Sequence, residues 1–331
     1  MESAPVIITD DIPGSPDDVI AIFHELDVSP TVLRPSQFID GGVSISLRLD
    51  QSGQALRILS PQGEICLQEG QRVWLRRPVA PKMSDTRYSP AIREFIVRQF
   101  DSTMASIYSF PLIWMNEYWL ANKIDQNKPF QQMLAKQSGL TTVPTLCTNN
   151  VDEFRQFVCE CKQLVAVKAC AGWSASVEEE DIAVGIYTNA IDKQKALSLA
   201  DSVARAPLLV QPYVPKKHEI RVTVVGTQVF PCRIDSQASP IASEDWRRYD
   251  FTNVPHSRCS IPGELRRRIL RFMHNAGLHF GALDFIVTPD GEYVFLEVNP
   301  SGQYGWIEGL TGMQISRAIA DWLLSTESTH N

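Results

Sequence analysis

The chain has 331 residues, which is too long for one small domain, and 44% of them are hydrophobic, which is enough for a buried core. Its net charge of −7 provides no overall positive field, so we expect neither a nucleic-acid partner nor an anionic membrane surface. The first residues lack the pattern of a signal peptide, and no apolar run reaches the ~20 residues of a membrane span. A soluble, cytoplasmic protein is therefore expected.

The first third of the sequence predicts an α/β domain that ends near residue 115. In chain order, its predicted elements are a strand at 6–9, a helix at 17–26, a strand at 31–33, a hairpin over 43–59, a strand at 73–75, a long helix at 91–108 and a strand at 112–114. Strands that alternate with helices in this way are typical of a sheet covered by helices.

The remainder predicts two further domains, over residues 116–205 and 206–331. The first contains helices at 127–139, 151–161 and 196–204, with strands at 143–145 and 164–168. The second contains strands at 208–210, 220–225 and 228–234, a helix at 264–275, a hairpin over 281–298 and a helix at 313–324. This order predicts an α+β arrangement around an antiparallel sheet.

The last hairpin predicts a metal site. Its turn lies at 288–291, and a pairing of Val287 with Glu292 places Asp284 opposite Phe295. The two-residue period of a strand then puts three oxygen-bearing side chains on one face, namely Asp284, Glu297 and Asn299. The other face is apolar and suits the core, with Leu283, Phe285, Val294, Leu296 and Val298.

Two carboxylates and an amide are the oxygen ligands that Mg²⁺ binds in proteins. Two carboxylates on one face repel each other unless a cation joins them, which favours the metal site. The alternative is the solvated side of an ordinary amphipathic hairpin. Because this face is expected to be partly exposed, replacing Asp284 or Glu297 by alanine should abolish turnover and leave the fold intact.

The order Asp284, then Glu297-Val298-Asn299-Pro300, resembles the signature of the ATP-grasp superfamily. This resemblance implies an ATP-grasp fold of mixed α/β and α+β class, preceded by an N-terminal α/β domain. It also implies a ligase that uses ATP and Mg²⁺. Within the loop 169–176, which takes the place of the superfamily's phosphate-covering loop, only one residue is glycine.

The resemblance assigns roles to residues upstream of the hairpin. Lys128 and Lys168 match lysines that contact ATP phosphates, and Glu219 matches the acid that binds the ribose. Gln211, Pro212, Tyr213 and Val214 look like the hinge that binds adenine through backbone groups. Lys168, Arg221 and Arg247 match cationic residues near the phosphates and the developing acyl phosphate, and would be catalytic by neutralising charge.

Physical chemistry supports these assignments unequally. A lysine at the end of a buried strand is costly without a partner, so Lys168 independently indicates a nearby anion. Lys128 is equally compatible with a solvated helix position, and each arginine alone with a surface position. No covalent enzyme intermediate is needed, so neither Cys170 nor Ser174 is expected to act as a nucleophile.

The whole chain is most similar to the graspetide ligases, the microviridin-type maturases that cross-link side chains of a ribosomal precursor peptide. Three segments carry this resemblance, at 73–78, 140–149 and 299–308. It implies a precursor with leader and core as substrate, joined by ester or amide bonds through an acyl phosphate. Arg76 and Arg77 would hold an acidic substrate side chain. The acidic run Glu178, Glu179, Glu180 and Asp181 would dock a basic patch of the precursor.

Each substrate assignment has a plain alternative, which is a surface ion pair for the arginines and a solvated turn for the acidic run. Two other functions share the ATP and Mg²⁺ residues. One is a ligase that adds free amino acids or glutamate, and the other is a nucleotide-binding regulator without turnover, which has less need of the complete Asp284, Glu297 and Asn299 set. A homodimer is one assembly compatible with the sequence.

The cysteines carry no metal or disulfide pattern. They are scattered without a C-x-x-C pair, and their odd number fits a disulfide framework poorly. We therefore expect buried thiols in a reducing compartment. The seven residues are Cys66, Cys147, Cys159, Cys161, Cys170, Cys232 and Cys259.

Overall fold

A computed structural model describes the chain except for residues 1–3, 13, 40–41, 51–52, 61–62, 172–173, 178–181, 186–188, 240–252 and 327–331. Its contacts divide the chain into two compact units. Unit 1 comprises Met1–Tyr118, Gln303–Gly305 and Gln314–Asn331, and unit 2 comprises Trp119–Gly302 and Trp306–Met313. The end of the chain therefore belongs with its beginning, a return that the predicted domains do not include.

Unit 1 contains a parallel sheet with the strand order β2-β1-β6-β7. The strands are β1 (Val6–Thr9), β2 (Thr31–Leu33), β6 (Arg72–Arg76) and β7 (Ile113–Trp114). Every residue of β1 is buried, because its continuous apolar run is covered on both faces. The helices α1 (Ser15–Glu25) and α9 (Ile315–Leu324) pack against each other, although they stand at opposite ends of the sequence.

The rest of unit 1 is an antiparallel three-stranded sheet and a long helix. The sheet contains β3 (Ser44–Asp50), β4 (Gly53–Ser60) and β5 (Gly63–Leu67), so the predicted hairpin is confirmed and gains a third strand. A short 3₁₀ helix, η1 (Pro35–Gln37), precedes it. The helix α2 (Pro90–Tyr108) begins after Ser89, whose side chain accepts a hydrogen bond from the Ile92 N–H, and its buried residues, Met104, Ile107 and Tyr108, all lie in its second half.

Unit 2 begins with a four-stranded antiparallel sheet in the order β13-β10-β14-β9. These strands are β9 (Leu146–Thr148), β10 (Leu164–Lys168), β13 (Asn189–Asp192) and β14 (Leu208–Pro212). The predicted helix at 196–204 is divided into α6 (Lys193–Ser198) and the 3₁₀ helix η2 (Ala200–Arg205), which share a core with α5 (Val151–Glu160). A separate hairpin consists of β11 (Ser174–Val177) and β12 (Ile182–Gly185).

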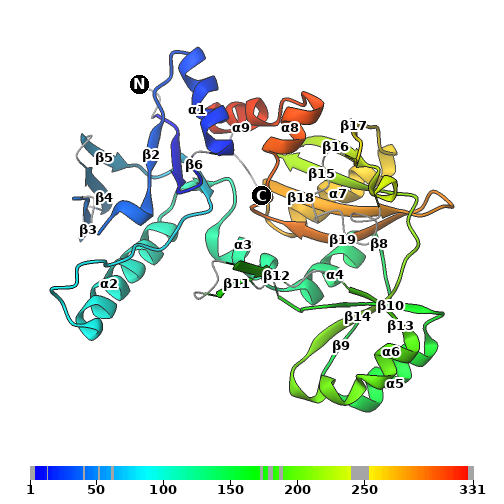
Figure 1. The fold of residues 1–331 in the computed structure, drawn as a ribbon. Coiled ribbons are helices and arrows are strands. Elements are labelled where there is room, and N and C mark those ends of the chain that lie inside the picture. The colour runs from blue at the N-terminus through cyan, green and yellow to red at the C-terminus, as the bar shows by residue number, and fades with distance from the viewer. Residues whose placement is uncertain are drawn as a thin grey trace. The chain divides into compact units, whose positions relative to one another are not determined.

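The second sheet of unit 2 has six strands in the order β17-β16-β15-β18-β19-β8 (Figure 1). They are β8 (Thr141–Thr142), β15 (His218–Val225), β16 (Gln228–Ile234), β17 (His256–Arg258), β18 (Phe280–Val287) and β19 (Tyr293–Asn299), all antiparallel except β8 with β19. The other elements are α3 (Tyr118–Asp125), α4 (Lys128–Gln137), η3 (Ser236–Ala238), α7 (Gly263–Asn275) and α8 (Gly305–Thr311).

An extensive hydrophobic core lies on one face of this six-stranded sheet. Leu134 of α4 and Phe272 of α7 pack there against Phe285 of β18 and Phe295 of β19. The opposite face of the same strands is left for the predicted metal and nucleotide residues. None of the described helices is both long and apolar enough to cross a membrane.

Candidate ATP and metal site

The strands β15, β18 and β19 carry the predicted metal residues in neighbouring rows. Arg221 lies opposite Asp284, and Asp284 lies opposite Glu297. In the next row, Asn299 lies opposite Ala282. Directly opposed residues in an antiparallel sheet project from the same face, so these side chains share one side of the sheet.

A β-bulge at Leu296 produces this convergence. Phe285 pairs with Phe295 and Asp284 pairs with Glu297, so Leu296 is an extra residue between two pairs of the described hairpin. The predicted register, with Asp284 opposite Phe295, is wrong. Without the bulge, Asp284 would lie opposite Leu296 and Glu297 would point into the core.

The bulge also changes which apolar residues face the core. Val294 and Leu296 were expected on the core face, but they contact Ile286 and Val143 in a small cluster apart from the main core. Phe295 takes the core position instead. The face that carries the carboxylates therefore continues into an apolar surface.

Asp284 forms a buried ion pair with Arg221. Nη1 of Arg221 donates to both carboxylate oxygens, at 3.0 and 2.9 Å, and both side chains are 6% exposed. Asn299 Nδ2 lies 3.5 Å from the same carboxylate. Gly302 permits this packing, since a Cβ built there would lie 2.8 Å from Nη2 of Arg221 and 2.5 Å from the Cβ of Ala282.

The second carboxylate is paired with a lysine from α4. Nζ of Lys128 donates to Oε2 of Glu297, and their side chains are 19% and 13% exposed. Asn127 begins the helix, because its side chain accepts a hydrogen bond from the Phe130 N–H at 3.0 Å. The N–H of Lys128 donates to the Cys170 carbonyl at 3.0 Å, which joins α4 to the segment after β10.

Two glutamines of α4 hold the bulged part of β19. Gln131 is 2% exposed, and its side chain both accepts from the Val298 N–H at 2.9 Å and donates to the Val298 carbonyl at 3.1 Å. Gln132 donates to the Leu296 carbonyl at 2.7 Å. The parallel partner β8 pairs only with Val294 and Phe295, so these side chains supply hydrogen bonds where that strand has ended.

Gln131 and Gln132 were not among the predicted site residues. The signal was present, because Gln131 stands at the helical spacing of the buried Leu134 and Ala135. A polar side chain on the apolar stripe of a helix requires internal hydrogen bonds.

The predicted adenine hinge comprises the last two residues of β14 and the two residues that follow it. Gln211 is buried and donates to Thr145 Oγ1 at 2.8 Å, and Pro212 pairs with Val165. The N–H of Tyr213 donates to the Leu164 carbonyl at 3.0 Å. Val214 packs against the apolar cluster of Ile286, Val294 and Val143, so the hinge borders the apolar continuation of the carboxylate face.

The predicted ribose acid, Glu219, is also in a buried ion pair. Nζ of Lys216 lies 2.8 Å from its Oε1, and the two side chains are 3% and 5% exposed. Lys216 was not predicted as a site residue, since nothing in its local pattern distinguishes it from a surface lysine. Burial, together with Arg233, lowers the pKa of the neighbouring His218. Burial raises the pKa of Cys232, opposite Arg221, to about 12.

The two predicted phosphate lysines come from different elements of unit 2. Lys168 ends β10 opposite Leu209 of β14, whereas Lys128 opens α4. The backbone hydrogen bond from Lys128 to Cys170 joins the start of α4 to the segment that follows Lys168. Of the predicted phosphate-covering loop, residues 174–176 belong to strand β11, and residues 172–173 lie outside the described residues.

Arg247 and the acidic run Glu178, Glu179, Glu180 and Asp181 lie outside the described residues. They remain predictions.

The two arginines predicted to hold substrate occupy different environments in unit 1. Arg76 is 1% exposed, lies 3.3 Å from Oδ2 of Asp11, and is 5.8 Å from the centre of the Tyr304 ring. Burial lowers its pKa to about 10, with Arg77 as the next cause. Arg77 is exposed and has φ = 44°. Arg76 is therefore buried and Arg77 exposed, and the substrate role of both arginines stays a prediction.

The residues of the hairpin suit a hard divalent cation. Asp284, Glu297 and Asn299 bring two carboxylates and an amide to one face, and Mg²⁺ prefers oxygen ligands completed by water and phosphate. Within the described ranges, no cluster of three or more His, Cys, Asp and Glu residues forms an alternative metal centre.

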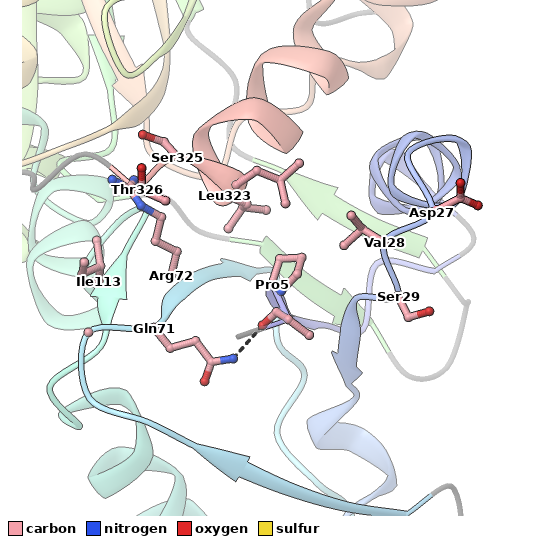
Figure 2. A pocket seen from close by; sticks show the side chains of 13 residues that line it. Pro5, Asp27, Val28, Ser29, Gln71, Arg72, Ile113, Leu323, Ser325 and Thr326 are labelled. Atoms are coloured by element: carbon pink, nitrogen blue, oxygen red, sulfur yellow. Dashed lines mark hydrogen bonds between the residues drawn. The ribbon is translucent and has the colours of Figure 1, made fainter. Parts of the chain in front are cut away.

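A cavity of about 590 Å³ lies elsewhere, within unit 1 (Figure 2). Its walls come from the N-terminal ends of β1 and β6, from β7 and from the end of α9, and Gln71 donates to the Ala4 carbonyl at 2.6 Å beside it. The lining residues include Arg72, Ile113 and Leu323 and none of the predicted ATP or metal residues.

The cysteines differ from their prediction as buried thiols. All seven are free, but Cys66, Cys147 and Cys159 are exposed, and Cys170 and Cys259 are half-buried. Only Cys161 and Cys232 are buried. Exposure was misjudged because these residues lie on edge strands and at helix ends, which composition does not reveal.

Solved structures of similar fold cover nearly the whole chain. A RiPP-associated ATP-grasp ligase from Chryseobacterium gregarium, in complex with ADP and a leader and core peptide, is 23% identical with a TM-score of 0.87, covering 98% of this chain and 97% of its own. The macrocyclase MdnC from Microcystis aeruginosa, bound with precursor peptide MdnA, is 24% identical with a TM-score of 0.82, covering 97% and 99%. The macrocyclase MdnB from the same organism is 28% identical with a TM-score of 0.76, covering 97% and 99%.

These similarities confirm the predicted ATP-grasp fold of mixed α/β class. No match is found among curated proteins. Residues 131–323 match the RimK-like ATP-grasp domain, a segment that begins in α4 and ends in α9 and so includes every predicted metal residue. The match spans more than half of the chain, which therefore belongs to the RimK-like ATP-grasp family.

Proposed function

We propose that this protein is an ADP-forming ligase that cross-links side chains of a ribosomally made precursor peptide. Its substrates would be ATP and a precursor with a leader and a core, and its metal would be Mg²⁺. The bonds formed would be esters or amides between side-chain carboxylates and side-chain hydroxyl or amino groups of the same peptide.

The observation that carries this proposal is the similarity along the entire chain. The match to MdnB covers 97% of this protein at 28% identity, so it includes unit 1 as well as the ATP-grasp part. The family match to residues 131–323 alone supports ATP-dependent ligation without indicating a substrate. Structures of the same fold that hold leader, core or precursor peptides support a peptide as the substrate.

The chemistry requires activation of a carboxylate, which is a poor electrophile. A substrate carboxylate oxygen attacks the γ-phosphoryl group of ATP, the bond to the bridging oxygen breaks, and ADP leaves. The acceptor hydroxyl or amine then attacks the acyl carbon, loses its proton and displaces phosphate. The sum is loss of one water from the peptide and hydrolysis of one ATP to ADP and phosphate.

Charge neutralisation and alignment account for the catalysis of phosphoryl transfer. Lys128, Lys168 and Arg221 would oppose the negative charge of the phosphates. Asp284, Glu297 and Asn299 would hold Mg²⁺, which neutralises charge on the transferred group when it is bound. The apolar surface formed by Ile286, Val294 and Val214 suits the face of an adenine ring.

An acyl phosphate must react before water reaches it. A donor and an acceptor on one bound peptide meet this requirement, because the second step is then intramolecular with a high effective concentration. A leader outside the cross-linked core would add binding energy without occupying the reacting centre.

The test uses the full chain with ATP, Mg²⁺ and a peptide encoded beside its gene that is rich in Thr, Lys, Asp and Glu. Mass spectrometry should show loss of one water per cross-link, with ADP and phosphate released, and removal of the leader should reduce the product. Glu297→Gln is the matched inactive control. Release of AMP would refute the acyl-phosphate route.

Two other outcomes correspond to the alternative functions. A product that gains the mass of an amino acid would identify a ligase for free amino acids or glutamate. ATP binding with only slow hydrolysis, and no change in peptide mass, would identify a regulatory nucleotide-binding protein.

A further inference from the structure

Two cysteines at the four-stranded sheet of unit 2 approach each other at their sulfur atoms. Cys147 lies in the edge strand β9, and Cys170 follows the end of β10 by two residues. Strand β14 lies between β9 and β10, and its Leu209 pairs with both Cys147 and Lys168. Cys170, two residues after Lys168, therefore lies just beyond the first residue of β14, Leu208. The two Sγ atoms lie 3.2 Å apart.

This distance is about 1 Å longer than a disulfide bond of about 2.05 Å, so small movements of the two side chains suffice to join them. Both residues are free thiols. The Sγ of Cys170 also lies 3.7 Å from the carbonyl oxygen of Pro207, the residue directly before β14. The pair therefore closes around the end of one strand.

Exposure distinguishes the two thiols. Cys147 is exposed and meets a dissolved oxidant first, whereas Cys170 is half-buried. Burial raises the pKa of Cys170 to about 12, with the neighbouring Cys147 as the next cause, so Cys170 reacts slowly with dissolved reagents, and its attack within the protein depends on the 3.2 Å between the two sulfur atoms. Its position suits it to attack a sulfur that is already activated at Cys147.

We propose that Cys147 and Cys170 form a reversible disulfide by exchange with a low-molecular-weight disulfide. In the first step, the Cys147 sulfur attacks one sulfur of the reagent, whose S–S bond breaks, and one thiol leaves with the proton from Cys147. In the second step, the Cys170 sulfur attacks Cys147, and the second thiol leaves with the proton from Cys170. One reagent disulfide is reduced to two thiols, and one protein dithiol is oxidised.

The disulfide would act on the nucleotide site, a consequence that rests on the proposed function. The carbonyl of Cys170 accepts the N–H of Lys128, and Lys168 lies two residues before Cys170. A bond at Cys170 therefore restrains both lysines assigned to ATP phosphates. If it displaces one charge-assisted contact, nucleotide affinity falls by about tenfold.

The first experiment tests the bond itself and requires no activity. The full chain is incubated with oxidised glutathione, its remaining thiols are blocked, and its unreduced proteolytic peptides are mapped by mass spectrometry. We expect a peptide pair that joins Cys147 to Cys170, lost after dithiothreitol and absent from Cys147→Ser. The matched control Cys66→Ser, which removes another exposed thiol, should retain the link.

Two results would overturn the proposal. One is a glutathione adduct on Cys147 that persists without an internal link, and the other is a link between a different pair, such as Cys159 and Cys161. Cys147→Ala provides a second variant, because a side chain on the exposed edge strand tolerates replacement with little cost in stability.

The second experiment measures ATP affinity by calorimetry for the reduced and the oxidised chain. A weaker affinity after oxidation, reversed by dithiothreitol and not seen in Cys147→Ser, supports the coupling. Equal affinities of linked and reduced protein refute it. If the reduced protein binds no ATP, the proposed function fails, and the disulfide is judged from the peptide map alone.

Discussion

Asp284 and Glu297 differ in what surrounds them, although both are assigned to the same cation. Replacing Asp284 by alanine leaves the buried charge of Arg221 without its carboxylate, at a cost of about 3–5 kcal/mol in the free energy of unfolding. Glu297→Ala should cost only about 1 kcal/mol, because Lys128 reaches solvent more easily. Both variants should lose Mg²⁺-dependent ADP release. Denaturant unfolding, together with an ADP assay, checks both expectations.

This difference revises the expectation that either alanine variant leaves the fold intact. The Asp284 side chain is 6% exposed, so it does not lie on a partly solvated face. Asp284→Asn, which keeps a hydrogen-bond acceptor for Arg221, should recover part of the stability without the activity. Equal losses of stability in the two alanine variants would contradict the role given to Arg221.

Gly302 is predicted to be intolerant of any side chain. An added methyl group would lie 2.5 Å from the Cβ of Ala282 and 2.8 Å from Nη2 of Arg221, so the pair of Arg221 and Asp284 must shift. Gly302→Ala should cost about 1–3 kcal/mol and lower turnover. Gly309→Ala is the matched control, because its new methyl group meets no atom within 4 Å. Similar unfolding curves for the two variants would refute the prediction.

At the scale of elements, the helix α4 contacts the hairpin of β18 and β19 that carries the two carboxylates. The helix supplies Lys128 to Glu297, and its glutamines hydrogen-bond the backbone of β19 around the bulge. A bulge exposes backbone groups that the ladder no longer satisfies, and burial makes such groups costly. The geometry of the carboxylates therefore depends on the helix.

Gln131→Met tests this dependence. The variant keeps the approximate volume but leaves the N–H and carbonyl of Val298 without the side chain that bonds both. We expect a loss of about 2–4 kcal/mol in the free energy of unfolding. We also expect a higher Mg²⁺ concentration for half-maximal ADP release, because Val298 lies between Glu297 and Asn299 in the sequence.

The control is Gln132→Met, which removes a single hydrogen bond, to the Leu296 carbonyl. Its stability and its Mg²⁺ requirement should change less than those of Gln131→Met. A variant of Gln131 that loses stability while its Mg²⁺ requirement stays at the wild-type value would show that the glutamine supports the fold alone.

At the scale of the whole molecule, the helix α9 belongs to unit 1 together with the first 118 residues. Ile319 of α9 is fully buried in unit 1, where the helix packs against α1 and β6. Ile319→Ala should cost about 2–5 kcal/mol by leaving a cavity. Hydrogen exchange should accelerate for the amides of β1, while those of β15 and β18 in unit 2 keep their protection.

Arg317→Ala provides the comparison on the same helix. The Arg317 side chain is 48% exposed and pairs with Asp321 one turn later, so its loss should change stability by less than about 1 kcal/mol. Exchange rates in β1 that respond equally to both substitutions would contradict the packing role of α9.

Local sequence patterns determined most elements and the family. Continuous apolar runs predicted β1, alternation predicted the hairpins, and Asn127 marked the start of α4, because each signal acts over a few neighbouring residues. The combination of Asp284 with Glu297 and Asn299 was sufficient to indicate an ATP-grasp protein.

Only the tertiary structure decided how these residues meet. The bulge at Leu296, the bonds from Gln131 to Val298 and the approach of Cys147 to Cys170 join positions that are remote in sequence or depend on an exact register. A shift of one residue in strand pairing exchanges the two faces of a sheet, and local propensity does not specify that shift. The return of α9 to unit 1 has the same origin, because long-range packing leaves no periodic signal in the sequence.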